Sequence, residues 1–192
     1  FGLWVPMTWT AAERARRKQA DEPLLDKPIN SELGNVSPWI IVPGHYSSMQ
    51  LQAQAENVAA SITNNAGFNC VSTRALITWK HWPQREDFLS RLQAILSKLP
   101  RRVAYYPGAL DRFARFTGCE FDGGESRDGL PQLPWTLFRD VNPAESPLLC
   151  REESFVPVCA EMPLDADDEF DFVGKATDFA NDGLWGTLCA TL

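Results

Sequence analysis

Hydrophobic residues along the chain follow two spacings that alternate from one segment to the next. Short runs of β-forming residues predict strands over 39–42, 72–79, 102–106, 135–141 and 154–162, and the apolar run 39–42 suits a strand buried on both faces. Between such runs, apolar residues recur every three or four positions, as in Leu51, Ala55, Val58, Ala59 and Ile62 and in Phe88, Leu92, Ile95, Leu96 and Leu99. Strands alternating with helices predict an α/β domain with a mainly parallel sheet.

Capping residues give the expected helix starts. Thr10 with Glu13 and Ser47 with Gln50 have the spacing of a capping box, and Pro83 is placed to open a further helix that ends before Pro100. Two later segments, 109–116 and 168–182, also have helical spacing, whereas 184–192 has the composition of a closing strand. The Gly-, Asp- and Pro-rich stretch 119–134 predicts a long loop of the kind that has a functional reason.

Composition and charge narrow the class of protein. With 192 residues, 44% of them hydrophobic, the chain can bury a sizeable core, and we expect one domain over 1–192. The net charge of −7 argues against a nucleic-acid surface, and the basic cluster at 14–18 is expected to be a solvated helix face. No apolar run is long enough to span a membrane and no signal peptide precedes the first strand, so we expect a soluble protein with neither nucleic acid nor membrane as partner.

The cysteines indicate reduced thiols rather than disulfides or metal ligands. Their number is odd and their spacing wide: Cys70, Cys119, Cys150, Cys159 and Cys189. This pattern favours an intracellular, cytoplasmic protein, and most of these thiols should be buried as small hydrophobes. No pair has CxxC spacing, so we expect no metal site. The chain lacks an initiator Met and ends within an apolar run, from which we expect a piece of a longer protein.

Cys70 stands in an unusual turn. The stretch "NNAGFNCVSTRALIT" (64–78) sets it between an amphipathic helix and a buried strand, where small residues allow another backbone or a substrate to approach closely. Taken alone, a buried structural cysteine is the more common case. Glu32 stands in "SELGNVSPWIIVPG" (31–44), and alone it would be an ordinary surface carboxylate.

Together these two motifs resemble the catalytic domain of aldehyde dehydrogenases. That family has a glutamate in a Glu-Leu-Gly turn, followed some 30 to 40 residues later by a cysteine in an Asn-x-Gly-x-x-Cys loop; here Glu32 and Cys70 are 38 residues apart. A third segment, "REESFVPV" (151–158), resembles the family's Glu-x-Phe-Gly-Pro-Val, with Glu153 and Phe155 at the matching positions. The likeness runs from about residue 27 to the C-terminus. Asn35, Phe68 and Val156 depart from it, where a glycine, a glutamine or glutamate, and a glycine are usual.

The resemblance implies a three-layer αβα catalytic domain, and it implies chemistry for each motif. Cys70 would be the thiolate nucleophile, passing through a thiohemiacetal and a thioester, and Glu32 the general base that activates water. Glu153 would hold the nicotinamide ribose, and Phe155 would flank the ring of NAD or NADP. The substrate would be a small aldehyde, the full-length protein a homo-oligomer, and most of the cofactor site would lie in a domain that this chain lacks. We therefore expect no dehydrogenase turnover from the chain alone.

Three other functions remain open at this point. A Cys-His hydrolase would need His45 or His81 near Cys70. An acylating dehydrogenase would pass the thioester to coenzyme A, without the activated water that Glu32 implies. A non-catalytic member of the family could act as an interaction module.

Overall fold

The computed structural model describes residues 9–22, 32–121, 129–186 and 188–192, which fall into two compact units, Phe1–Glu32 and Leu33–Leu192. In the N-terminal unit, helix α1 (Ala11–Gln19) begins as predicted, since the side chain of Thr10 accepts a hydrogen bond from the Glu13 N–H. Glu13 binds Arg16 and Arg17, which hold the pKa of its carboxyl at about 2. No residue of α1 is buried, so the basic cluster is a solvated helix face, as expected.

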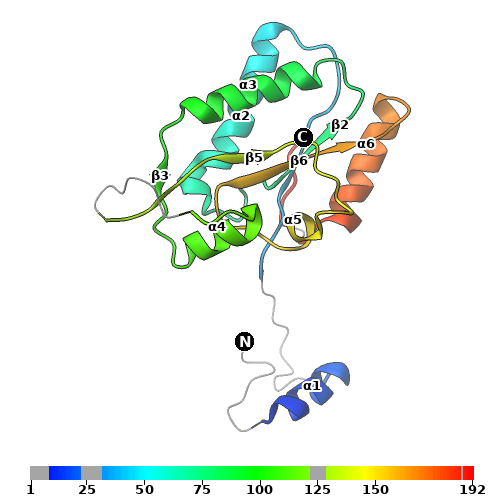
Figure 1. Ribbon diagram of the computed structural model, residues 1–192. Coiled ribbons are helices and arrows are strands. Elements are labelled where there is room, and N and C mark those ends of the chain that lie inside the picture. Colours follow the sequence, from blue (N-terminus) through cyan, green and yellow to red (C-terminus); the bar gives the residue numbers. More distant parts are fainter. Residues whose placement is uncertain (1–8, 23–31, 122–128, 187) are drawn as a thin grey trace. The chain divides into compact units, whose positions relative to one another are not determined.

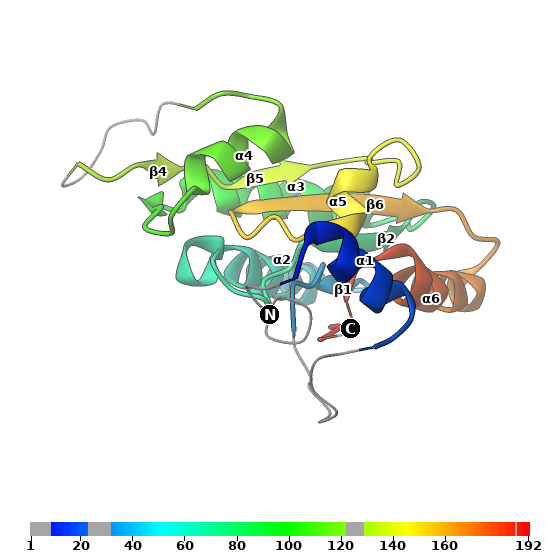
Figure 2. The same ribbon diagram turned by 90° about the horizontal axis from the view of Figure 1, so that it is seen from below.

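The C-terminal unit is built on a sheet of parallel strands. Its order is β1 (Pro38–Ile40), β2 (Ala75–Trp79), β6 (Val158–Leu164) and β5 (Thr136–Phe138), and every neighbouring pair is parallel. Figure 2 shows β5 and β6 side by side and pointing the same way. The predicted mainly parallel sheet is therefore confirmed, although most strands are shorter than the apolar runs that indicated them.

Helices cover both faces of this sheet, which gives the expected three layers (Figure 1). Helices α2 (Ser48–Thr63) and α3 (Arg85–Lys98) pack on one face, where Leu76 and Cys159 are buried. Helices α5 (Pro147–Arg151) and α6 (Glu169–Asp178) pack on the other, against Ala75, Ile77, Ala160 and Met162. Successive residues of a strand point to opposite faces, so β2 and β6 each supply both cores.

The helix ends follow the sequence signals closely. Ser47 and Gln50 form a complete capping box at the start of α2. Helix α3 starts two residues after Pro83 and ends before Pro100. Helix α4 (Ala109–Thr117) ends at Gly118 and covers a third core that includes Phe68, Leu133, Val156 and Val158. The short helix α5 was not predicted; Pro147 opens it.

Two segments differ from their predicted form. Residues 102–106 and the loop 119–134 contribute an antiparallel pair, β3 (Arg102–Val103) with β4 (Gln132–Leu133); positions 122–128 of that loop lie outside the described residues. The closing strand predicted over 184–192 is wrong for the described residues, where a single parallel bridge joins Thr191 to Trp39. The reason is that the Trp185 and Leu188 N–H groups donate to Cys150 and to the Asn35 side chain instead of to a neighbouring strand.

Candidate active site

Three segments that the sequence singled out meet at one edge of the sheet. Ser37 stands directly before β1, Cys70 shortly before β2, and Pro157 directly before β6. These strands are adjacent and parallel, so their amino ends lie at the same edge. The motif containing Cys70 and the one containing Glu153 and Phe155 are thereby brought together in the C-terminal unit.

The loop before Cys70 turns sharply because three residues in a row are left-handed. Asn65, Ala66 and Gly67 have φ values of 50°, 57° and 80° within the 3₁₀ turn η1 (Asn64–Gly67). At Gly67 a Cβ atom would lie 2.9 Å from Cα of Pro157, so only glycine fits there. The close backbone approach expected of this loop is confirmed, and the partner is the segment before β6.

Arg74 ties the same two segments together, and the sequence analysis missed it. The side chain is buried, and its guanidinium donates to the carbonyl oxygens of Gly67 and Val156, with a longer contact of 3.4 Å to that of Asn69. Burial lowers the pKa of Arg74 to about 10, so the group is still charged at neutral pH. An arginine inside a β-rich run was the available signal, since a buried charge there needs partners.

A second set of polar side chains lies on the β1 side of Cys70. The hydroxyl of Ser37 donates to the carbonyl oxygen of Cys70 at 2.6 Å and is itself 2.6 Å from Asn35 Nδ2. The thiol of Cys189 reaches the same hydroxyl at 3.3 Å. Asn35 and Ser37 are both buried, and neither Ser37 nor Cys189 was singled out by the sequence analysis.

Glu153 and Phe155 lie before β6 and are half-buried. A Cβ built on Gly34 would lie 3.3 Å from Glu153 Oε2, so this carboxylate is beside Gly34. Phe155 has a left-handed backbone, with φ of 48°, and its ring centroid is 4.9 Å from that of Tyr106 and 6.2 Å from that of Phe68. A left-handed backbone strains a non-glycine residue by about 1–3 kcal/mol, and residues strained in this way are typical of functional sites.

Glu32 is exposed and is the last residue of the N-terminal unit, whereas Cys70 belongs to the C-terminal unit. Its pairing with Cys70 therefore stays a prediction.

The five cysteines are all free thiols but differ in burial. Cys150 and Cys159 are buried as expected, and burial raises the pKa of both, to about 12 for Cys159. Cys119, which follows the Gly118 that ends α4, is exposed; because only two of the five thiols are buried, the expectation that most of them are buried is wrong. Cys70 and Cys189 are half-buried, which leaves Cys70 partly accessible.

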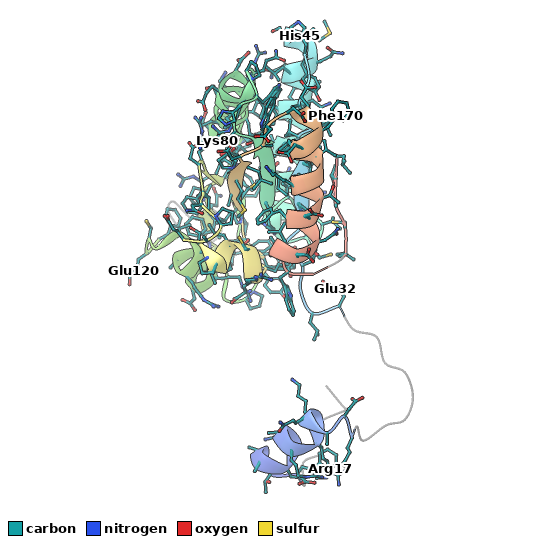
Figure 3. The ribbon with its side chains drawn as sticks, turned by 90° about the vertical axis from the view of Figure 1, so that its right-hand side faces the viewer. Arg17, Glu32, His45, Lys80, Glu120 and Phe170 are labelled. Atoms are coloured by element: carbon teal, nitrogen blue, oxygen red, sulfur yellow. The ribbon has the colours of Figure 1, made fainter. Side chains whose placement is uncertain are left out.

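Both histidines lie at the other end of the sheet. His45 follows β1 and His81 follows β2, whereas Cys70 precedes β2. Figure 3 shows His45 and Lys80 toward one end of the C-terminal unit, and His81 directly follows Lys80 in the sequence. His81 binds Asp165 at 2.9 Å on the surface. A histidine base for Cys70 is thus unsupported, and within the described residues no cluster of His, Cys, Asp or Glu could hold a metal ion.

Comparison with known proteins gives matches in structure but not in sequence. No family model matches the chain, and no curated protein does. Among solved structures, the chain is similar to an NAD-dependent aldehyde dehydrogenase from Sinorhizobium meliloti, with a TM-score of 0.59 and 22% identity over 83% of this chain. The chain has an aldehyde dehydrogenase fold. The resemblance seen in the sequence is thereby confirmed at the level of the fold.

Two further structures agree. A γ-glutamyl-γ-aminobutyraldehyde dehydrogenase from Burkholderia cenocepacia matches 83% of this chain with a TM-score of 0.65 and 22% identity. The NAD+ complex of an aldehyde dehydrogenase from Bacillus cereus matches 87% with a TM-score of 0.63 and 17% identity. The chain spans 32%, 33% and 34% of the three solved chains, which is about a third of their length. No helix among the described residues is long and apolar enough to cross a membrane.

Proposed function

We propose that this chain carries the catalytic domain, over 1–192, of an enzyme that oxidises an aldehyde to a carboxylic acid with NAD or NADP as cofactor. The observation that supports this most strongly is the meeting of the Cys70 loop with the Glu153–Phe155 segment at the amino ends of adjacent parallel strands. Oxidation of an aldehyde in that family requires the cysteine nucleophile to lie near the residues that hold the nicotinamide, and the two motifs meet within an aldehyde dehydrogenase fold. A small-molecule aldehyde is the proposed substrate, and a homo-oligomer the proposed assembly.

Cys70 is the proposed nucleophile. Its thiolate attacks the aldehyde carbon, a C–S bond forms, and the carbonyl π electrons move to oxygen to give the oxyanion of a thiohemiacetal. The oxyanion then re-forms the C=O bond as the carbon-bound hydrogen leaves as hydride, for which a nicotinamide cofactor held by Glu153 and Phe155 would be the acceptor, and a thioester remains. Water then attacks the thioester carbon, the C–S bond breaks, and the acid leaves while Cys70 regains its thiolate. Glu32 is the proposed general base that takes a proton from this water.

The backbone around Cys70 can stabilise the oxyanion. Its N–H belongs to the peptide that follows Asn69, and the Asn69 carbonyl accepts from the Ser72 N–H at 3.2 Å and contacts Arg74. In a trans peptide the N–H points opposite to the carbonyl, so the Cys70 N–H points away from these donors. Within the described part of the chain it donates no hydrogen bond, and it remains available to a substrate oxygen.

Glu153 and Phe155 are the proposed cofactor contacts. A half-buried carboxylate can accept hydrogen bonds from both hydroxyls of a ribose, and an adjacent aromatic ring offers a flat apolar wall, so the two side chains fit a nicotinamide nucleoside. The cofactor itself would supply a hydride acceptor. Phe155 is held against Tyr106 and Phe68, which keeps its ring at this edge of the sheet.

Acylation of Cys70 tests the proposal without a cofactor. A nitrophenyl ester should transfer its acyl group to Cys70, and mass spectrometry of the digested protein should find the thioester there. Cys70→Ser should abolish the thioester at this position, whereas Cys119→Ser removes an exposed thiol that has no part in the proposed chemistry and should change nothing. Absence of acylation at Cys70 in the folded wild-type chain would overturn the proposal.

The oxidation itself is measured in a protein that includes the rest of the subunit, as aldehyde-dependent reduction of NAD or NADP. If coenzyme A stimulates turnover, the thioester is passed to coenzyme A by acyl transfer instead of being hydrolysed. If Cys70 is acylated but no aldehyde reduces either cofactor, the interaction module becomes the better description.

A further inference from the structure

We infer that Ser37 is a positioning residue for Cys70, acting through a hydrogen-bond relay with Asn35. This inference rests on the proposed function and adds a residue to it. Ser37 does not touch the reacting atoms. Its hydroxyl donates instead to the carbonyl oxygen of Cys70, 33 positions further along the chain, at 2.6 Å.

The relay fixes which way the Ser37 proton points. The Leu188 N–H donates to Asn35 Oδ1 at 3.2 Å, which identifies that atom as the oxygen and turns Nδ2 of Asn35 toward Ser37. An amide nitrogen can only donate, so Ser37 Oγ accepts at 2.6 Å. It also accepts from the Cys189 thiol at 3.3 Å. A hydroxyl has two lone pairs and one proton, so the proton is directed at Cys70.

Cys70 is thereby held on both sides. The direction of its Cα–Cβ bond relative to the neighbouring peptide groups depends on the two dihedrals of its backbone, which are set by the peptide before it and the peptide after it. The preceding peptide is anchored through the Asn69 carbonyl by the Ser72 N–H and Arg74. The following peptide is anchored through the Cys70 carbonyl by Ser37. Together these contacts fix the direction of the Cα–Cβ bond that carries the thiol relative to the Cys70 N–H.

Asn35 explains one departure from the aldehyde dehydrogenase pattern, where this position is usually glycine. Its side chain fills the space beside Gly186, where a Cβ would lie 2.6 Å from Asn35 Oδ1 and the backbone has φ of 91°. The Asn35 amide therefore links the segment before β1 to the C-terminal segment. Ser37, which binds this amide, in turn binds the Cys70 loop.

Two reactions of Cys70 separate positioning from simple exposure. Acylation by a nitrophenyl ester needs both the thiolate and a correctly placed oxyanion donor, whereas alkylation by iodoacetamide needs the thiolate alone. Site-resolved mass spectrometry measures both rates at Cys70 in a Cys119→Ser background. Ser37→Ala should lower the ratio of acylation rate to alkylation rate by about five- to tenfold, because one hydrogen bond that orients the site is lost. Ser37→Thr, which keeps a hydroxyl, should restore the ratio.

Ser61→Ala is the matched control. Ser61 also makes a half-buried hydroxyl contact near the loop, 2.7 Å to Thr73 Oγ1, but it has no contact with Cys70 and should leave the ratio unchanged. If Ser37→Ala does not fold, Ser37→Cys keeps nearly the same volume with a much weaker donor and should show the same fall.

The outcomes are distinct. If wild-type Cys70 is acylated and the Ser37 variants keep the wild-type ratio, or lose both rates together, the positioning role is overturned and the proposed function stands. If wild-type Cys70 is not acylated at all, the proposed function fails and the positioning role fails with it.

Discussion

Arg74 and Val156 are 82 positions apart in the sequence, yet the guanidinium of Arg74 donates a hydrogen bond to the Val156 carbonyl oxygen. The same guanidinium binds the Gly67 carbonyl, so one buried side chain joins the loop that leads to Cys70 with the segment that follows Phe155. One residue therefore contributes directly to the relative position of the two halves of the candidate site.

Replacement of Arg74 should separate these halves. Lysine keeps the charge but cannot reach both carbonyls with one planar group, so Arg74→Lys should lower the free energy of unfolding by about 2–4 kcal/mol. Chemical denaturation followed by fluorescence measures the change. Arg91→Lys alters a half-buried side chain that pairs with Asp87 at 2.8 Å and contacts Ser48 at 3.2 Å, and it should cost less than about 1 kcal/mol. Equal effects of the two substitutions would show that Arg74 does not hold the loop.

Gly67 should tolerate no side chain. In Gly67→Ala the new Cβ would press on Pro157 at 2.9 Å and the left-handed backbone would be strained, so we expect a loss of about 2–4 kcal/mol of unfolding free energy. Gly118→Ala provides the matched control, since its φ of 71° is similar but no heavy atom lies within 4 Å of its Cβ position. That control should lose only about 1–2 kcal/mol. Thermal unfolding of both variants checks the difference, and a Gly67→Ala variant as stable as Gly118→Ala would refute the close approach.

The thiols should react with iodoacetamide in an order set by burial. Cys119 is exposed and Cys70 half-buried, so both should be labelled before Cys150 and Cys159. Raising the pH from about 7 to about 9 should not bring Cys159 into reaction, because burial raises its pKa to about 12 and the reactive thiolate does not form in that range. Mass spectrometry after partial labelling gives the order. Labelling of Cys70 no faster than of Cys150 would remove the main support for a nucleophile at this position.

Glu153 should affect the cofactor and not the thiol. In a protein that includes the rest of the subunit, Glu153→Gln should weaken binding of NAD or NADP, or slow hydride transfer, by about tenfold, because a neutral amide accepts weaker hydrogen bonds from the ribose hydroxyls. Titration of the cofactor and single-turnover kinetics separate the two effects. Glu152→Gln changes the neighbouring carboxylate, which pairs with Arg115 at 2.5 Å, and should leave both measurements unchanged. Unaltered binding and hydride transfer in Glu153→Gln would exclude the residue from the site.

Much of the fold could be predicted because its signals are local. The capping box of Ser47 and Gln50 and the helical spacing of Leu51 and Phe88 lie within single elements, where nearest neighbours along the chain decide the conformation. The strand predicted at the C-terminus failed for the opposite reason. Its composition suits a strand, but the Leu188 N–H is taken by Asn35, 153 positions away, which no local pattern records.

The sequence by itself determined the alternation of strands and helices, the ends of the main helices, and the order of the motifs that carry Glu32, Cys70, Glu153 and Phe155. Only the tertiary structure decided that Ser37 and Arg74 meet the Cys70 loop, that Gly67 touches Pro157, and that Cys119 is exposed. The physical reason is that these contacts end on backbone carbonyls and backbone atoms, which every residue has. A side chain that binds a backbone carbonyl can pair with any residue type, so its partner cannot be predicted from the sequence. The partner is decided only when the parallel strands bring their amino ends together.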